Sequence, residues 1–186
     1  MIDAQTQAVL QEIVRRESRS LLRYVGDAFP WTTSRGEARI DQATAATSGG
    51  TKFGVWAVRG QEQYGAYALA NVQQILADYN DYFGFKFPLP KLDSIAVPGG
   101  FQGAMENWGA ITYNDQALLV TPSSTLRTRQ EVFSIQAHEM AHQWNGDLVT
   151  MGWWDDLWLN ETFATWRSAQ ETALRNPTWD WLEVQD

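Results

Sequence analysis

The only two histidines of the chain stand four residues apart, in the segment His138-Glu139-Met140-Ala141-His142. On an α-helix, positions i and i+4 lie on one face, one turn apart, so both imidazoles can reach a single metal ion. Glu139 lies about 100° further around such a helix than His138, where its carboxylate can address a water molecule on the ion rather than the ion itself. The spacing therefore predicts a helix that carries two metal ligands and one carboxylate base.

A third metal ligand must come from a carboxylate. The chain contains no cysteine, which excludes thiolate sites, iron–sulfur clusters and disulfides. Catalytic zinc sites have three protein ligands and an open position for water, and no third histidine exists. Glu161 is the candidate, 19 positions after His142 (161 − 142), which leaves room for a loop and a second helix docked antiparallel on the first. Its apolar neighbours predict a buried carboxylate, which needs a partner such as a metal ion.

This set of residues predicts hydrolytic chemistry. Zinc lowers the pKa of a bound water molecule towards ~7 and so provides hydroxide near neutral pH. Glu139 would take the proton as general base and return it to the leaving amine. Together the residues predict metal-assisted hydrolysis of a peptide bond or a similar acyl bond.

The overall composition excludes several other classes of protein. The formal net charge is −8, whereas nucleic-acid binding needs clustered lysine and arginine for phosphate contacts. No apolar run approaches the ~20 residues of a membrane span, and the polar start of the chain lacks the pattern of a signal peptide. We therefore expect a soluble protein, cytoplasmic by default, that binds neither nucleic acid nor membrane and whose oligomeric state the sequence leaves open.

Hydrophobic periodicity predicts the elements of the first half of the chain. Residues 5–25 have the spacing of an amphipathic helix, and residues 30–50, rich in Thr, Ala, Ser and Gly, indicate a loop or linker. A short strand is expected over residues 53–58. A helix over residues 64–83 would follow and end at Gly84.

The second half begins with further strands and then becomes helical. Strands are expected over residues 92–97, 108–113 and 117–120, with a loop over 99–103. The metal motif falls within a helix expected over 125–144. The fold class is therefore α+β, with strands first and helices after.

A second helix after the metal motif is expected from its end signals. Asp155 is a good N-cap residue, and Asn176-Pro177 would end the helix after Arg175. A last helical segment would begin at Thr178. The first of these two helices would carry Glu161.

Another motif, Gly103-Ala104-Met105-Glu106-Asn107, precedes the metal-binding helix. Together with H-E-x-x-H, and with Glu161 after eighteen intervening residues, it resembles the gluzincin aminopeptidases of the aminopeptidase N and puromycin-sensitive type. Similar flanking segments are Pro88-Leu89-Pro90-Lys91-Leu92-Asp93, Trp108-Gly109, Gln143-Trp144 and Trp158-Leu159-Asn160. The resemblance implies that residues 51–186 form a partial, thermolysin-like zincin catalytic domain. Residues 1–50, an N-terminal helix and linker, have no assigned place.

The resemblance also implies roles for individual residues. The ligands that it implies for a single zinc ion are His138, His142 and Glu161, with Glu139 as the base. Segment 103–107 would line the substrate cleft as an extended edge. There Glu106 would receive the α-ammonium of a peptide with a free N-terminus, and the backbone of Gly103 and Ala104 would bond the peptide. Since a carboxylate in a closed cleft selects a charged N-terminus, the implied activity is that of a zinc aminopeptidase.

The chain also departs from the pattern of that family. Thr162 follows Glu161 where the family usually has glycine or serine. The family's enzymes have an N-terminal β-rich domain, a C-terminal helical domain and, after the zinc glutamate, a tyrosine that stabilises the oxyanion. All six tyrosines of this chain precede the metal motif. We therefore expect both domains and that tyrosine to be missing, and the loss of an oxyanion donor lowers a rate by about 10²–10³-fold.

Three functions remain open at this point. The chain is a zinc aminopeptidase core, a truncated and non-catalytic zinc-binding fragment, or an interaction fragment with a relic metal site and a tryptophan-rich interface. A relative that hydrolyses epoxides would share the zinc motif. The intact Glu139 favours the enzyme, because metal binding alone needs no base. Some late tryptophans would pack against a missing C-terminal part and leave an apolar patch: Trp153, Trp154, Trp166, Trp179 and Trp181.

Overall fold

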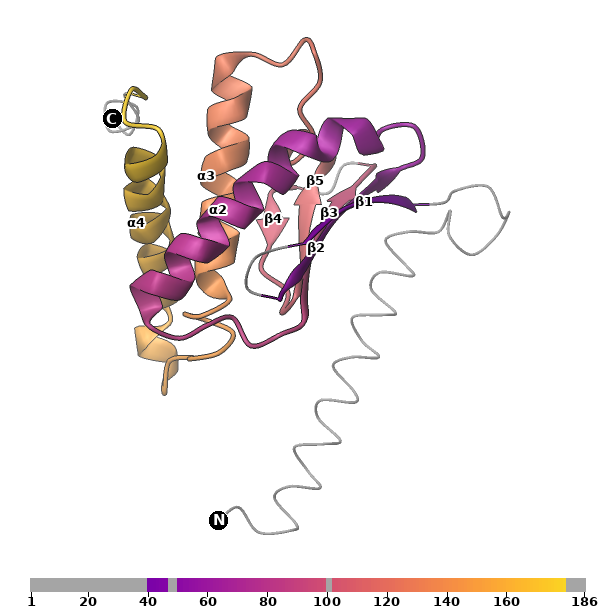
Figure 1. Cartoon of the computed structure of the whole chain (residues 1–186). Helices are drawn as coiled ribbons and strands as arrows, with labels where there is room; N and C mark the ends of the chain where they lie inside the picture. Colours follow the sequence, from indigo (N-terminus) through magenta and orange to yellow (C-terminus); the bar gives the residue numbers. More distant parts are fainter. Residues whose placement is uncertain (1–39, 47–49, 100–101, 180–186) are drawn as a thin grey trace, which may run out of the picture. The chain divides into compact units, whose positions relative to one another are not determined.

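The computed structural model describes residues 40–46, 50–99 and 102–179. The helix expected over residues 5–25 lies outside these residues, as does the last helical segment beyond residue 179. One compact unit begins at Ile40 and contains every described residue (Figure 1). The metal motif and segment 103–107 both belong to this unit.

The unit contains a five-stranded mixed sheet with the strand order β1-β2-β3-β5-β4. Its strands are β1 (Ile40–Ala46), β2 (Lys52–Val58), β3 (Lys91–Val97), β4 (Ala104–Met105) and β5 (Ala110–Asn114). Strands β2, β3 and β5 are parallel neighbours, whereas β1 and β4 pair antiparallel at the two edges. Buried residues follow one another in β2 and β3 without strict alternation, as in strands that are covered on both faces.

Among the described residues, three α-helices accompany this sheet: α2 (Ala66–Phe83), α3 (Leu126–His142) and α4 (Trp158–Arg175). The 3-10 turn η2 (Glu62–Gly65) leads into α2, which connects the parallel strands β2 and β3. Helix α2 ends at Gly84, whose φ of 62° is in the left-handed region that glycine adopts at low cost. Helix α3 packs against α2 and α4, and Figure 1 shows α3 and α4 side by side. The α+β expectation is confirmed.

The predicted loop over residues 30–50 is wrong over residues 40–46, which form β1. This strand pairs along its length with β2, from Ile40 opposite Val58 to Ala46 opposite Lys52. Its sequence has no clear hydrophobic alternation, and its pairing is a backbone ladder with a strand that follows it in the chain. Periodicity alone therefore did not reveal it.

The strand predicted over residues 117–120 is also wrong. The 3-10 helix η3 (Asp115–Ala117) is followed by irregular chain in which Leu118, Leu119 and Val120 are buried. The Val120 N–H donates to the Tyr64 carbonyl at 3.0 Å instead of to a neighbouring strand. A short apolar run predicts burial, but it does not by itself specify a strand.

The start of the last described helix differs from the prediction as well. Asp155 lies within the 3-10 turn η4 (Trp154–Asp156), and α4 begins three residues later with Leu157 as N-cap residue and no side-chain cap. The predicted end is confirmed, since α4 ends at Arg175. None of the helices in the described part of the chain is both long and apolar enough to cross a membrane.

Some of the late tryptophans are exposed. Trp153 and Trp154 are 66% and 77% exposed, and Trp166 is 48% exposed. Trp179 instead packs edge-to-face on Phe133 of the core, with ring centres 6.0 Å apart. Three of the five tryptophans are therefore exposed, whereas Trp179 contacts the core and Trp181 lies outside the described residues.

Candidate metal centre

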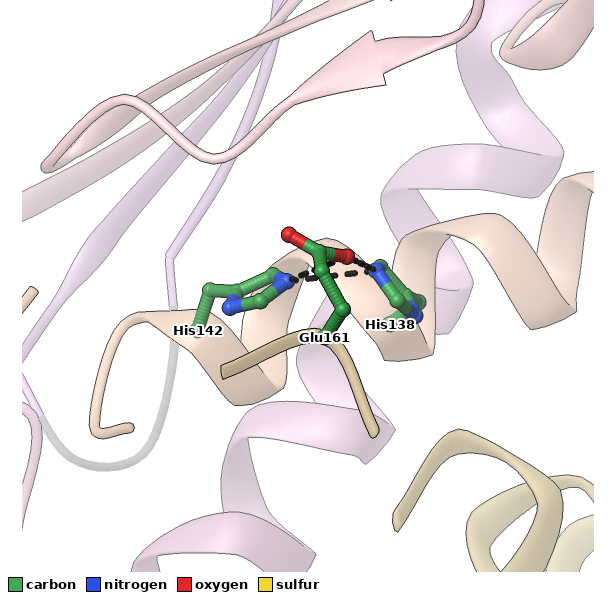
Figure 2. Close-up of side chains that lie close together, drawn as sticks. All are labelled: His138, His142 and Glu161. Carbon is green, nitrogen blue, oxygen red and sulfur yellow. Dashed lines mark hydrogen bonds and ion pairs between the residues drawn. The ribbon is translucent and has the colours of Figure 1, made fainter. Parts of the chain in front are cut away.

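The last two turns of α3 present both imidazoles to the first turn of α4. Figure 2 shows His138 and His142 one turn apart, with the carboxylate of Glu161 beside both rings. The two Nε2 atoms are 3.1 Å apart. Oε2 of Glu161 lies 3.2 Å from Nε2 of His138 and 3.6 Å from Nε2 of His142. The fold thus brings together two nitrogens from α3 and one oxygen from α4.

These separations fit a zinc ion. Zinc binds histidine nitrogen and carboxylate oxygen at about 2.0–2.1 Å in a tetrahedron, which separates neighbouring ligand atoms by roughly 3.3–3.4 Å. The three observed separations lie between 3.1 and 3.6 Å. Two imidazoles and one carboxylate are also the ligand set of a catalytic zinc site with one open position. The group can therefore hold one metal ion.

The ring of His142 is oriented through its other nitrogen. Nδ1 lies 3.2 Å from the Asn145 carbonyl oxygen and 3.2 Å from Oδ1 of Asn160. Both of these oxygens are acceptors, so Nδ1 carries the proton and Nε2 keeps the lone pair that a metal ligand needs. On His138, Nδ1 lies 3.5 Å from Oγ1 of Thr165 on α4.

Gly146 makes the approach of Asn160 to His142 possible. Its φ is 133°, and a Cβ at this position would lie 2.5 Å from Oδ1 of Asn160 and 3.2 Å from Nδ1 of His142. Real Cβ atoms essentially never come within 2.5 Å of another heavy atom, and a contact of 3.2 Å is already tight. The loop after α3 therefore needs glycine here to leave the outer shell of the metal site intact.

Replacing Asn160 by alanine is expected to weaken zinc binding by about 10–100-fold, the usual effect of losing an outer partner of a metal ligand. The His142 ring would keep only the Asn145 carbonyl as acceptor at Nδ1 and would hold its orientation less firmly. Competition with a chromogenic chelator measures the zinc affinity. An unchanged affinity would mean that the Asn145 carbonyl alone is enough to orient the ring.

Glu139 is a buried carboxylate within the metal motif. It is 7% exposed, and burial raises its pKa to about 8, with nearby carboxylates, Glu106 first among them, adding to the rise. A cation held by the adjacent histidines would oppose this rise through its charge. Glu139 and His138 also line a cavity of about 170 Å³ between α3 and α4. The base candidate therefore faces space in which a small molecule can lie.

The expectation that Glu161 is buried is wrong. Its side chain is 65% exposed, and the neighbouring Leu157, Trp158 and Leu159 are 49%, 61% and 39% exposed. The first turn of α4 lies on the surface of the described unit, so apolar neighbours in the sequence do not cover the carboxylate. Its place is set instead by its contacts with His138 and His142.

Charged side chains hold α4 against α2. Nη2 of Arg167 donates to Oε2 of the fully buried Glu171 at 2.9 Å, and its guanidinium lies 4.6 Å from the ring centre of Tyr79 on α2. Further along α4, Arg175 bonds to Asp78 of α2. Buried ion pairs add little net stability, but breaking one is strongly destabilising. The Arg167 contact with Tyr79 and the Arg175–Asp78 pair therefore join the helix that carries Glu161 to α2, whereas the Arg167–Glu171 pair lies within α4.

Within segment 103–107, Ala104 and Met105 form the edge strand β4, antiparallel to β5. The Asn114 N–H donates to the Gly103 carbonyl at 2.8 Å. Because backbone groups of successive residues point to opposite sides of a strand, those of Ala104 point away from β5. An extended peptide can add to the sheet on this side. Met105 is 48% exposed.

Glu106 follows β4 and acts electrostatically on the metal motif. Burial lowers the pKa of His138, and the charge of Glu106 opposes that change. Asn107 donates through Nδ2 to Oγ1 of Thr112 at 3.1 Å, which ties the residue after Glu106 to β5. The fold therefore gathers negative charge around the two histidines, and such a field attracts cations and ammonium groups.

Three further residues lie against His142 or Glu106 and were not predicted from the sequence: Asn160, Gly146 and Gln143. Asn160 and Gln143 belong to segments that carried the family resemblance, but residue type alone assigned them no contact. Gly146 comes just after the helix expected over residues 125–144, and its residue type predicts only that the helix ends there. An amide residue directly before or after a metal ligand is the signal that could have pointed to the first two.

A family model described as the peptidase family M1 domain matches residues 67–185, which is more than half of the chain. The chain belongs to peptidase family M1. This confirms the resemblance to the gluzincin aminopeptidases. Members of the M1 family are generally zinc-dependent, in keeping with a histidine, histidine and glutamate group that could hold a metal ion.

Individual M1 relatives match this part of the sequence. Aminopeptidase N of Acetobacter pasteurianus is 58% identical over 119 residues, which are 63% of this chain and 34% of that protein. Aminopeptidase N of Lactococcus lactis subsp. lactis is 45% identical over 141 residues, which are 75% of this chain and 17% of that protein. The puromycin-sensitive aminopeptidase of Caenorhabditis elegans is 46% identical over 127 residues, 68% of this chain and 13% of that protein. The M1 chain thus spans between 13% and 34% of the length of these relatives.

Proposed function

We propose that this chain is the core of a zinc-dependent aminopeptidase that hydrolyses the N-terminal peptide bond of peptides with a free N-terminus. The observation that carries the proposal is the convergence of three ligand atoms, from His138, His142 and Glu161, at separations of 3.1–3.6 Å. The three relatives described above are named aminopeptidases. Their names support the same class of reaction for this chain.

The metal-binding role rests on how the chain prepares its ligands. A zinc ion at this position would supply a Lewis acid that acidifies water and polarises a carbonyl group. Acceptors at Nδ1 of His142 keep its Nε2 free to bind. Burial lowers the pKa of His138, so its imidazole is neutral and able to bind a metal at neutral pH. The Arg175–Asp78 pair joins α4, the helix that carries Glu161, to α2.

Glu139 is proposed as the general base and then the general acid. Its carboxylate takes a proton from the attacking water, and the same proton passes to the leaving amine as the C–N bond breaks. Burial raises the pKa of this group, which makes its carboxylate a stronger base than that of an exposed glutamate. Its side chain also lines the cavity between α3 and α4, where a reacting group has room.

Glu106 is proposed to hold the α-ammonium of the substrate. A charge-assisted hydrogen bond from an ammonium to a carboxylate is about twice as strong as a neutral one. An internal segment of a peptide brings no ammonium and leaves this carboxylate without a partner, so the site would favour chain ends. The backbone of Ala104 faces the side of β4 on which the substrate backbone would pair.

The proposal predicts zinc-dependent hydrolysis of alanine p-nitroanilide but not of its N-acetyl derivative. Glu106→Gln should lower kcat/KM by about tenfold or more, mainly by raising KM, because the amide keeps the shape of the side chain without its charge. Steady-state assays of zinc-loaded and chelator-treated protein measure both effects.

Two results would count against this function. Equal hydrolysis of the acetylated substrate would contradict recognition of a free amine. Zinc binding without hydrolysis of either substrate would favour the alternative, a truncated zinc-binding fragment without catalysis of its own.

A further inference from the structure

Gln143, directly after the metal motif, has a fully buried side chain, 0% exposed. Its Oε1 accepts from the Gly109 N–H at 2.9 Å, and its Nε2 donates to the Glu106 carbonyl oxygen at 2.6 Å. The same Nε2 donates to Oδ2 of Asp147 at 2.8 Å. Neither metal binding nor the proton transfers proposed for Glu139 use any of these bonds.

The two backbone bonds of Gln143 hold the turn between β4 and β5. The Glu106 carbonyl and the Gly109 N–H lie at the two ends of this turn, and the Ala110 N–H closes it on the Asn107 carbonyl at 2.9 Å. The φ of Gly109 is 72°, and a Cβ there would lie 2.6 Å from Cδ1 of Leu89. The turn is therefore tightly packed, and one amide group connects it to the end of the metal-binding helix.

The bonding pattern of this amide leaves it one orientation. A primary amide has two N–H donors and one carbonyl oxygen. One N–H goes to Asp147, the other goes to the Glu106 carbonyl, and the oxygen accepts from Gly109. Rotating the amide by 180° would place its NH₂ group against the Gly109 N–H, donor against donor. Its oxygen would then face the Glu106 carbonyl oxygen and Oδ2 of Asp147, acceptor against acceptor. The contact with Glu106 is thus specified rather than incidental.

We propose that Gln143 is a positioning residue that sets the place of Glu106 relative to the metal-binding histidines, and so determines the affinity for substrates with a free N-terminus. This inference rests on the amine-binding role proposed for Glu106. Gln143 follows the ligand His142 directly in the chain and holds the backbone of Glu106 itself. A shift of that carbonyl therefore moves the carboxylate with respect to the metal site, and small displacements in a binding site weaken binding strongly.

The same helix offers a matched control. Gln136 is also fully buried, 0% exposed. It accepts from Nδ2 of Asn71 at 2.9 Å and donates to the Ala68 carbonyl at 3.0 Å. Its partners lie on α2, away from β4. Methionine at either position removes the polar atoms with little change in volume, so both variants lose buried hydrogen bonds but only one loses contact with Glu106.

The experiment measures binding of trialanine and of N-acetyl-trialanine by calorimetry, using zinc-loaded protein that carries Glu139→Gln to prevent turnover. We expect Gln143→Met to lower the affinity for trialanine by about tenfold or more. Gln136→Met should leave that affinity within about twofold, although both substitutions lower the Tm. Zinc affinity should stay the same in all three proteins. If Gln143→Met does not fold, Gln143→Glu is used, since it keeps an acceptor for Gly109 but offers no N–H to Glu106.

The outcomes separate this inference from the proposed function. If the Gln143 and Gln136 variants bind trialanine equally well, the positioning role is overturned and the aminopeptidase proposal stands. If the parent protein binds trialanine and its acetylated form equally, the amine-binding role of Glu106 is overturned, and the role of Gln143 with it. A loss of affinity confined to the Gln143 variants supports both.

Discussion

Glu139→Gln is expected to slow the hydrolysis of alanine p-nitroanilide by about 10²–10⁴-fold, the usual contribution of a general base, without a loss of zinc. Glutamine keeps the shape of the side chain but cannot take a proton from water at neutral pH. Zinc binding should persist, because the three atoms that meet at ligand distance come from His138, His142 and Glu161. Only the proton transfer is removed.

The same substitution should leave the metal-free fold nearly as stable as before. Burial raises the pKa of Glu139 to about 8, so without a metal ion the folded chain holds this group mostly protonated at pH 7. A neutral amide then replaces a neutral acid of the same size, and such volume-conserving exchanges usually have small effects. Thermal unfolding in the presence of a chelator measures this.

The control for Glu139→Gln is the same exchange at an exposed position of α3. Glu131 pairs with Arg127 one turn away, and both side chains are about half exposed, 48% and 52%. Glu131→Gln should therefore retain both zinc and activity. A loss of zinc together with activity in the Glu139 variant would contradict a role confined to proton transfer. Full activity in that variant would contradict any role as base.

The metal helix and its two imidazoles could be predicted from the sequence because they depend only on local geometry. A spacing of four residues fixes the relation of His138 to His142 once the segment is helical. Glu161 could be proposed because the chain offers neither cysteine nor a third histidine. The exposure of the Glu161 side chain could not be predicted, since it depends on which other elements cover the first turn of α4.

The elements that were predicted wrongly depend on contacts between distant parts of the chain. Residues 40–46 become a strand because β2 pairs with them, and residues 117–120 lack a strand partner even though three of them are buried. Residue type and periodicity describe the local preference of a segment. They do not say which backbone lies beside it.

The outer partners of the site escaped prediction for the same reason. Asn160 reaches His142 across 18 residues of sequence, and Gln143 reaches Gly109 and Glu106 across 34 and 37 residues. Each amide can bond to almost any polar group. Only the packing of α3 on β4, and of α4 on α3, selects these partners.

Zinc is expected to raise the temperature of thermal unfolding of this chain, and Glu161→Gln is expected to remove most of that rise. An ion that binds only the folded state, at a thousandfold excess over its Kd, stabilises it by about 4 kcal/mol. For a chain of this length that corresponds to roughly 8–16 °C in Tm. Because the ligands come from two helices, α3 and α4, unfolding separates them, and the binding free energy becomes folding free energy.

Glu161 is the most informative ligand to replace, because its side chain is 65% exposed whereas that of His142 is 1% exposed. Alanine at position 142 would leave a cavity and destabilise the chain even without metal, whereas glutamine at position 161 keeps the volume and removes only the charge. For Glu161→Gln we therefore expect an unchanged metal-free Tm. Its zinc affinity should fall further than that of Asn160→Ala, for which a loss of about 10–100-fold is expected. Scanning fluorimetry with zinc or with chelator measures this, and Glu131→Gln should keep the full rise. If zinc raises the Tm of Glu161→Gln as much as that of Glu131→Gln, Glu161 is not a ligand.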